Sequence, residues 1–148
     1  PTDSGAGTDL AMIARGCGIA DTGTVRDASE VAALVKDVRT KKGPVFHTAI
    51  VAGVQAAKRT HELIPFCHPL GIENCRVDID MQENDAVVRC TVSVHHRTGV
   101  EMEALTCASI AALTIYDMCK SLSHDIVIAE TKLIAKQGGK SDFGEVPG

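Results

Sequence analysis

The stretch TGVEMEALTCASIAALTIYDMCK, residues 98–120, decides the fold that we expect for this chain. A set of its residues recurs at steps of three and four, which would place them along one face of a helix. The set comprises Glu103, Thr106, Ile110, Thr114, Asp117 and Lys120. The remaining positions are mostly Ala, Leu, Ile and Cys, and ionisable groups stand only near the two ends. The pattern predicts a helix whose middle is buried on most sides.

Two alternating segments come before this helix. Residues 75–81 alternate Cys, Val, Ile and Met with charged side chains, and residues 88–94 alternate Val and Cys with polar ones. The polar residues 82–85 between the two segments favour a turn. We therefore expect an antiparallel hairpin with one apolar face.

Four further elements are predicted from spacing and from Gly and Pro positions. They are a short edge strand within residues 10–20, a helix over 27–39, a slim alanine-rich helix over 45–63 and a strand over 126–136. An antiparallel sheet with helices packed on one face accommodates this order, so we expect an α+β fold, a ferredoxin-like sandwich. Residues 1–148 form a single domain in this interpretation, with a loose start at 1–9 and a polar tail at 138–148.

Composition excludes several classes of protein. The 148 residues carry a formal net charge of −4, so there is no basic excess to hold a nucleic-acid backbone. There is no run of about eighteen apolar residues, so we expect no membrane span. None of the six cysteines has a CxxC spacing, a usage typical of a reducing compartment. We expect a cytoplasmic protein, or a mitochondrial one if it is a eukaryotic mature chain, that forms homo-oligomers to cover its apolar helices.

Asp117 and Lys120 stand three residues apart near the end of the predicted helix and can interact. As a solvated surface pair they would contribute only about 0–1 kcal/mol. Burial beside the apolar segment would instead raise the pKa of the carboxyl and lower that of the ammonium, while their attraction opposes both shifts. A lysine tuned in this way can transfer protons near neutral pH. The sequence leaves both interpretations open.

Other residues also have a structural and a functional interpretation. Glu101 and Glu103 would stabilise a helix N-terminus, or accept hydrogen bonds from the ring N–H groups of a guanine-like base. His68 lies between two prolines on a stiff arm, as a structural histidine or a ligand contact. The sequence GGKS at residues 138–141 is not a phosphate-binding P-loop, because Ile134 occupies the position of the required glycine. Its backbone N–H groups could still hold an anion.

Four motifs of the sequence resemble one family. They are LIPFCHPL at residues 63–70, TGVEMEALT at 98–106, ALTIYDMCK at 112–120 and GGKS at 138–141. In this order they resemble the cyclic pyranopterin monophosphate synthase family, the MoaC family of molybdenum cofactor biosynthesis. The similarity runs from about residue 41 to residue 143. It implies a ferredoxin-like protomer in a homohexamer, a trimer of dimers with active sites between subunits.

The resemblance also implies a reaction. The substrate would be the GTP-derived 3′,8-cyclo-7,8-dihydro-GTP, which a phosphorus–oxygen lyase converts to cyclic pyranopterin monophosphate with release of pyrophosphate. Lys42, Asp117 and Lys120 correspond to the acid–base set that the resemblance implies. Substrate contacts would come from Cys67, His68, Glu101, Met102, Glu103, Lys136 and Lys140. We expect no metal ligands in the protein and no redox cofactor; Mg²⁺ is the ion that a triphosphate could bring with it.

The sequence departs from the family pattern near its ends. The arginine of the family's N-terminal region corresponds here to Arg15 or to Arg26. Pro44 stands where an acidic residue is usual, and the GGKS motif is one glycine shorter than usual. These differences concern the N-terminal arm and the tail, and leave the central motifs intact.

Two other functions fit parts of the sequence. A non-catalytic ferredoxin-like module could bind a nucleotide or a partner, but it would not need the full acid–base set. A metalloprotein would have to use the adjacent Cys67 and His68, or two adjacent histidines at positions 95 and 96 on opposite faces of a strand. Both spacings are poor for a single ion. Pyrophosphate release from the cyclised GTP would distinguish the enzyme from the non-catalytic module.

Overall fold

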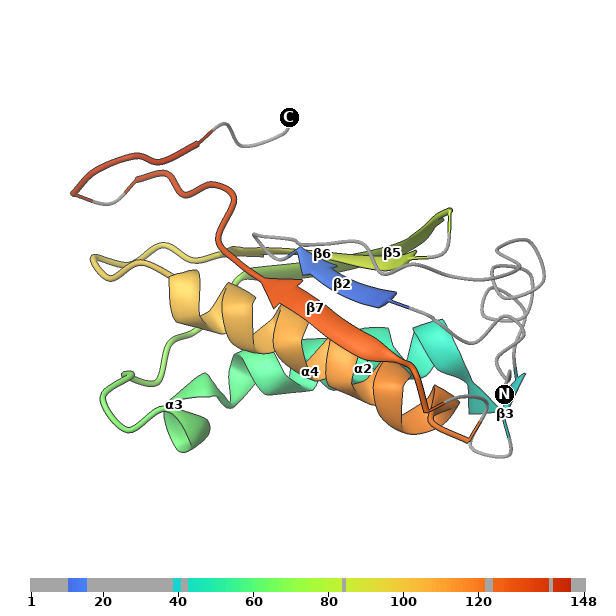
Figure 1. The fold of residues 1–148 in the computed structure, drawn as a ribbon. Coiled ribbons are helices and arrows are strands. Elements are labelled where there is room, and N and C mark those ends of the chain that lie inside the picture. The colour runs from blue at the N-terminus through green and yellow to red at the C-terminus, as the bar shows by residue number, and fades with distance from the viewer. Residues whose placement is uncertain are drawn as a thin grey trace.

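The computed structural model describes residues 11–15, 39–40, 43–83, 85–121, 124–138 and 140–144. They form two layers, a sheet and a pair of long helices that cover one of its faces (Figure 1). The helices are α2 (Val45–Lys58) and α4 (Glu101–Cys119). In order across the sheet, the strands are β5 (Asn74–Gln82), β6 (Asp85–Ser93), β2 (Ala11–Arg15) and β7 (Val127–Thr131). The expected α+β class with helices packed on the sheet is confirmed.

The strands pair antiparallel in the hairpin and parallel on both sides of β2. In the hairpin, Cys75 lies opposite Val92 and Val77 lies opposite Cys90, which confirms the predicted antiparallel hairpin. β2 runs parallel to β6 and to β7 and lies between them, so it is an interior strand and not the edge strand that the sequence predicts. The sheet is therefore mixed at β2, whereas the sequence predicts antiparallel pairing throughout. Residues 10–20 show no alternation, so the sequence carries no signal for the direction of this strand.

The helix predicted over residues 45–63 is two helices in the structure. α3 (Thr60–Leu63) follows α2, and Arg59 breaks the helix between them. The Thr60 hydroxyl donates to the carbonyls of Ala56 and Ala57, at 3.3 and 3.0 Å. The backbone N–H of Arg59 donates to the Ala56 carbonyl at 3.0 Å. These bonds use carbonyls that would otherwise continue the α-helical ladder, so the chain turns here.

The remaining predicted elements are shorter than expected or lie partly outside the described residues. The strand expected over 126–136 ends at Thr131. Most of the helix expected over 27–39 lies outside the described part of the chain. Two short strands, β3 (Arg39–Thr40) and β4 (Gly43–Pro44), pair antiparallel. Lys42, between them, is outside the described residues.

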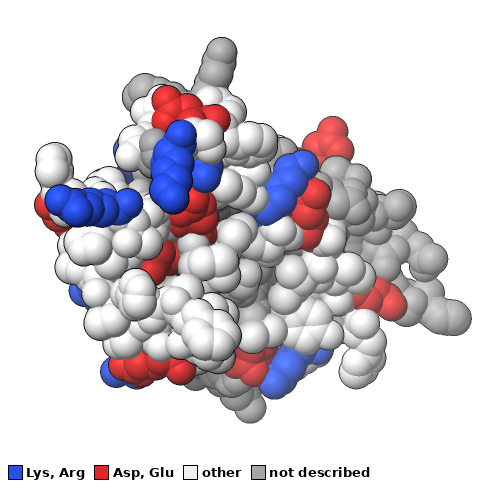
Figure 2. All heavy atoms as spheres, turned by 90° about the vertical axis from the view of Figure 1, so that its left-hand side faces the viewer, with Lys and Arg blue, Asp and Glu red and all other residues white. Residues whose placement is uncertain are grey.

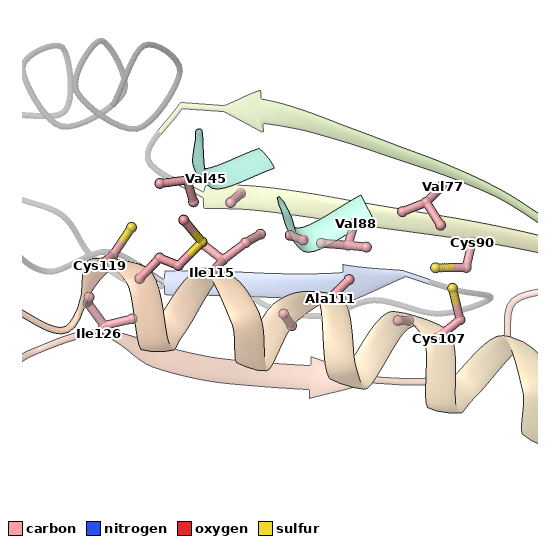
Figure 3. Packing of buried hydrophobic residues seen from close by; sticks show 14 of the residues in the cluster. Val45, Val77, Val88, Cys90, Cys107, Ala111, Ile115, Cys119 and Ile126 are labelled. Atoms are coloured by element: carbon pink, nitrogen blue, oxygen red, sulfur yellow. The ribbon is translucent and has the colours of Figure 1, made fainter. Parts of the chain in front are cut away.

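The core lies where α4 packs on α2 and the sheet (Figure 3). Cys107, Ala111 and Ile115 of α4 are fully buried, in keeping with the prediction that the middle of this helix is buried on most sides. A small residue sets the distance between the helices. A Cβ atom at Gly53 of α2 would lie 3.1 Å from the Cys107 carbonyl oxygen and 3.2 Å from the Ala111 Cβ. The two helices therefore approach closely enough that there is barely room for one more carbon.

Burial also accounts for the apolar composition of α4. By length and composition it is the one helix among the described residues that could cross a membrane. It contacts α2, β6, β2 and β7, and half of its most apolar window is buried inside the domain. These contacts are those of the core helix of a two-layer domain.

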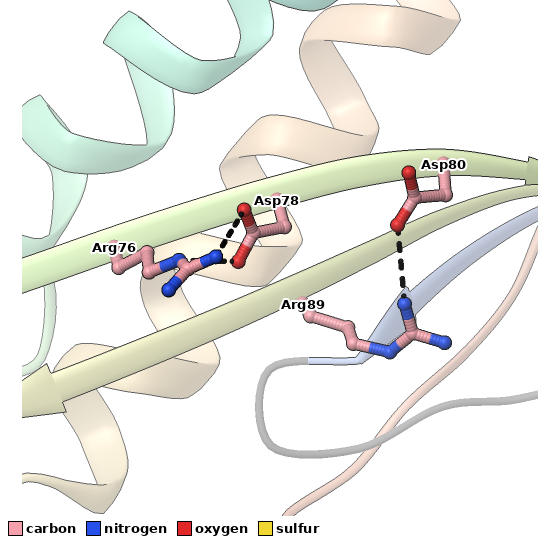
Figure 4. Close-up of polar contacts among 4 residues, drawn as sticks. All are labelled: Arg76, Asp78, Asp80 and Arg89. Atoms are coloured by element: carbon pink, nitrogen blue, oxygen red, sulfur yellow. Dashed lines mark hydrogen bonds and ion pairs between the residues drawn. The ribbon is translucent and has the colours of Figure 1, made fainter. Parts of the chain in front are cut away.

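The face of the hairpin that points away from the helices carries ion pairs (Figure 4). Arg76 donates two hydrogen bonds to Asp78, at 2.8 and 3.2 Å, and Arg89 donates one to Asp80 at 3.2 Å. All four side chains are well exposed, so each pair contributes about 0–1 kcal/mol. The charges keep this face polar, and the strict alternation then directs the apolar face to the helices.

We expect Gly53→Val to lower the free energy of unfolding by about 1–3 kcal/mol, the usual cost of overpacking a core. The added methyl groups would push α2 away from the Cys107 carbonyl. Ala52→Val is the matched control, because it adds the same residue to a half-exposed side of the same helix. Urea unfolding followed by circular dichroism measures the difference. Equal losses in the two variants would contradict the close helix packing.

Candidate active site

The first turn of α4 holds Glu101 and Glu103, two of the predicted site residues. Val100, which precedes the helix, offers no side-chain acceptor to the free N–H groups of this turn. Each glutamate instead accepts a hydrogen bond from its own backbone N–H. Carboxylates at this position are also favoured by the helix dipole. The helix-stabilising role that the sequence suggests is therefore present.

Glu101 also binds a lysine from the far end of the chain. The Nζ atom of Lys136 donates to Oε1 of Glu101 at 3.1 Å, and each side chain is only about one-third exposed (33% and 32%). The hydrogen bonds from its own N–H and from Lys136 hold the pKa of Glu101 below its ordinary value, although burial acts in the other direction. A carboxylate and an ammonium thus stand together at the start of α4.

The pKa of Glu103 is shifted in the opposite direction. Only 4% of this residue is exposed, and burial raises the pKa of its carboxyl. Its own N–H opposes the shift, the charge of Glu101 adds to it, and the charge of His61 opposes it. Two carboxyls separated by one residue therefore have pKa values moved in opposite directions, an arrangement that suits an acid and a base.

His61 is a neighbour of the site that sequence reasoning misses. It lies on α3, which packs against α4, and it acts electrostatically on the Glu103 carboxyl. The side chain is partly buried, with 33% exposed. No spacing rule connects residues 61 and 103, so only the packing of the two helices places this imidazole beside the site.

The other end of α4 carries Asp117 and Lys120. The Nζ atom of Lys120 donates to Oδ1 of Asp117 at 2.6 Å, which confirms the predicted contact. The Asp117 side chain is 47% exposed and the Lys120 side chain is 58% exposed, so both remain in contact with water in the described part of the chain. The burial that would tune the pair for proton transfer is thus not supplied by the described residues of one chain.

The proline-bracketed arm after α3 carries Cys67 and His68. Cys67 is half-buried and donates its backbone N–H to the Ile64 carbonyl at 3.1 Å, whereas His68 is exposed. Phe66, beside them, is 96% exposed, and Met102 in the first turn of α4 is 39% exposed. Figure 2 views the end of the molecule at which α4 begins, where groups of acidic and basic side chains stand beside uncharged surface.

The segment after β7 forms a closed loop that presents Lys140. Lys136 and Phe143 exchange two backbone hydrogen bonds, of 2.8 and 3.0 Å. Gly138 has a φ of 79°, in the left-handed region that favours glycine, and its N–H donates to Oδ1 of Asp142 at 3.1 Å. That N–H serves the loop itself and is not offered to an anion. Lys140 is exposed within the loop.

The structure sorts the predicted residues into two groups at opposite ends of α4. Lys136 joins Glu101 at the start, and Lys120 joins Asp117 at the end. Asp117 follows Glu101 by sixteen positions, which corresponds to about 24 Å along a helix. Three predicted residues have side chains outside the described part of the chain: Arg15, Arg26 and Lys42.

Comparison with known proteins places these motifs in one family. A family model described as MoaC family matches residues 14–139. This chain belongs to the MoaC family. A MoaC-family relative from Xanthomonas axonopodis pv. citri, named cyclic pyranopterin monophosphate synthase, is 58% identical over 123 residues, which cover 81% of this chain and 74% of the relative.

Two longer MoaC-family relatives match over a similar part of this chain. Molybdenum cofactor biosynthesis protein 1 of Dictyostelium discoideum is 59% identical over 112 residues, 75% of this chain and 18% of that protein. A molybdenum cofactor biosynthesis bifunctional protein of Synechocystis sp. is 52% identical over 117 residues, 76% of this chain and 34% of that protein. The MoaC sequence is thus also found as one part of longer polypeptides.

The two glutamates of this MoaC-family chain should affect stability with opposite signs. The folded-state pKa of Glu101 lies below its unfolded value of about 4.3, so its ionised form stabilises the fold above that pH. The folded-state pKa of Glu103 is raised, so its ionisation costs stability at neutral pH. We expect Glu101→Gln to lower the unfolding temperature at neutral pH and Glu103→Gln to raise it.

Thermal unfolding of both variants and the wild type, from neutral pH down to about pH 3, measures these effects. The contribution of Glu101 is lost as the pH falls through its folded-state pKa. The cost of Glu103 disappears once the pH falls below its unfolded value. Both differences from the wild type should therefore shrink in acid. Shifts of the same sign at neutral pH would contradict the assigned environments.

Proposed function

We propose that this chain is a cyclic pyranopterin monophosphate synthase of molybdenum cofactor biosynthesis. It converts 3′,8-cyclo-7,8-dihydro-GTP to cyclic pyranopterin monophosphate and releases pyrophosphate, as a phosphorus–oxygen lyase. The observation that carries the proposal is the Glu101–Lys136 contact, which joins a group that can recognise a base to one that can hold a phosphate. The names of the relatives from Xanthomonas and Dictyostelium support the same function.

The binding part of the proposed site surrounds the start of α4. The Glu101 and Glu103 carboxyls hydrogen-bond to the ring nitrogens of the substrate, and Met102 packs against its ring system. Cys67 and His68 supply further contacts from the proline-bracketed arm. The triphosphate meets the ammonium groups of Lys136 and Lys140, which neutralise its charge together with any Mg²⁺ that accompanies it.

The reaction needs proton transfers and a good electrostatic environment for a leaving group. Ring opening and re-closure move protons among nitrogen and oxygen atoms of the substrate, and Lys42, Asp117 and Lys120 are suited to this role. A substrate oxygen then attacks the α-phosphate, the cyclic phosphate forms, and the bond to the β-phosphate oxygen breaks. The departing pyrophosphate carries the electron pair away and is stabilised by cations. No electron transfer occurs in these steps.

The separation of the two groups argues for a site shared between subunits. About 24 Å of helix lies between Glu101 and Asp117, more than a pterin ring system spans. The outer face of the helical layer also exposes large apolar side chains, Val51 at 61% and Leu113 at 52%. We propose that this α+β protomer forms a homohexamer, a trimer of dimers, in which the α4 end of one chain meets the α4 start of another. Burial at that contact would remove water from Asp117 and Lys120.

Purified protein supplied with the cyclised GTP tests the proposal directly. We expect release of pyrophosphate and a product with the mass of cyclic pyranopterin monophosphate. A well-folded oligomer that binds this compound without releasing pyrophosphate would instead be a non-catalytic nucleotide-binding module. Light scattering on the same sample measures the number of subunits.

Asp117→Asn should lower the rate of product formation by about 10²–10⁴-fold, the usual effect of losing a general acid or base. Folding and substrate binding should be largely retained, because the exposed Asp117–Lys120 pair contributes little to stability. Asp78→Asn, which neutralises an aspartate on the outer face of the hairpin, is the matched control. A normal rate in the Asp117 variant would contradict its catalytic role.

Mixing two inactive variants tests whether the site is shared. Glu101→Ala damages the start of α4 and Asp117→Asn damages its end. If each site takes one group from each of two chains, mixed oligomers contain sites that have both intact groups, and activity returns. Subunits are exchanged under mild denaturant and the pyrophosphate released is then measured. No recovery in oligomers that contain both chains would place the two groups of each site in one subunit.

A further inference from the structure

A glycine close to the start of α4 has a feature that the proposed reaction does not use. Gly99 lies two residues before Glu101, and a Cβ atom at position 99 would overlap the Glu101 carboxylate, with Oε2 as the closest atom. Gly99 is not in the left-handed backbone region. The backbone conformation at this position therefore does not require a glycine. The space that a side chain would take is occupied by the Glu101 carboxylate.

The Glu101 side chain folds back into this space, where it can contact Lys136. The carboxylate reaches toward Gly99, accepts the hydrogen bond from its own backbone N–H, and accepts the Lys136 ammonium on Oε1 at 3.1 Å. Lys136 belongs to the loop that its backbone bridge with Phe143 closes. One carboxylate thus connects the first turn of α4 to the loop that carries both proposed triphosphate lysines.

We propose that Gly99 is a positioning residue, whose missing side chain lets the Glu101 carboxylate fold back and hold Lys136 at the start of α4. The clash from an added methyl group would fall on the end of a flexible side chain and not on backbone. Substitution should therefore move the carboxylate at little cost to the fold. The consequence is a misplaced Glu101 and a Lys136 without its anchoring partner.

This role deepens the proposed function, because it assigns Gly99 to the binding of the base and the triphosphate. Lys136 pairs with Glu101 when no substrate is bound, and its ammonium is then already held where a phosphate arrives. Pre-organisation of this kind lowers the ordering cost of binding. The effect of Gly99 should therefore be felt more in KM than in kcat.

Gly99→Ala is the test, and Gly71→Ala is its matched control. A Cβ atom at Gly71 would meet no atom within 4 Å, and Gly71 is also outside the left-handed region. We expect Gly99→Ala to raise KM about tenfold, as misplacing one charge-assisted hydrogen bond would, with a smaller change in kcat. Gly71→Ala should unfold at nearly the same temperature as the wild type, and Gly99→Ala should lose no more stability than Glu101→Gln does, because both affect the same carboxylate.

A double variant separates positioning from a general effect on the chain. If Gly99 acts only through the Glu101 carboxylate, Gly99→Ala should have no further effect on substrate affinity in the Glu101→Ala background, measured as an equilibrium dissociation constant because this background is inactive. A full, additive loss in that background would overturn the proposal. So would a Gly99→Ala enzyme with the same KM as the Gly71→Ala control.

A titration of Glu101 tests the same inference without turnover. The ¹³C shift of its carboxyl, followed by NMR against pH, reports its pKa, which the wild type holds below the ordinary value. Gly99→Ala should raise this pKa toward that value, and Gly71→Ala should not. An unchanged titration would overturn the role of Gly99 even if the enzyme is active. Absence of pyrophosphate release from the wild type would instead count against the proposed function alone.

Discussion

The close approach of α2 and α4 is the constraint on which the rest of the structure depends. Gly53 leaves barely enough room for the Cys107 carbonyl and the Ala111 side chain, so the two helices form one thin layer. That layer covers one face of the sheet, and α4 contacts three of its strands. Because α4 is held along its length, its two ends become fixed points, and both groups of proposed site residues are built on them.

The two ends of α4 illustrate two ways in which a protein can set the state of an ionisable group. At the start, burial raises the pKa of Glu103, and hydrogen bonds lower the pKa of Glu101, two residues earlier in the chain. At the end, Asp117 and Lys120 form a short contact but remain in water. This difference in solvation between the two ends of α4 is the physical reason for our proposal that a neighbouring subunit completes the site.

Much of the fold could be predicted because its signals are local. The alternation in residues 75–81 and 88–94 predicts the hairpin, and the three-to-four spacing from Glu103 to Lys120 predicts the helix α4. The direction of β2 could not be predicted, since its residues do not alternate. The break at Arg59 was also missed, because it depends on where the Thr60 hydroxyl finds its acceptors. For the site, motif resemblance named the residues but not their partners.

The sequence by itself determined the MoaC motifs, the apolar middle of α4, and the contact between Asp117 and Lys120. Each of these depends on residues only a few positions apart, whose geometry a helix or strand repeats wherever it occurs. Only the tertiary structure decided that Lys136 meets Glu101, that Glu103 is buried, and that His61 stands near it. These contacts join segments tens of residues apart, and packing brings such segments together through the sum of many small contacts that no short sequence pattern encodes.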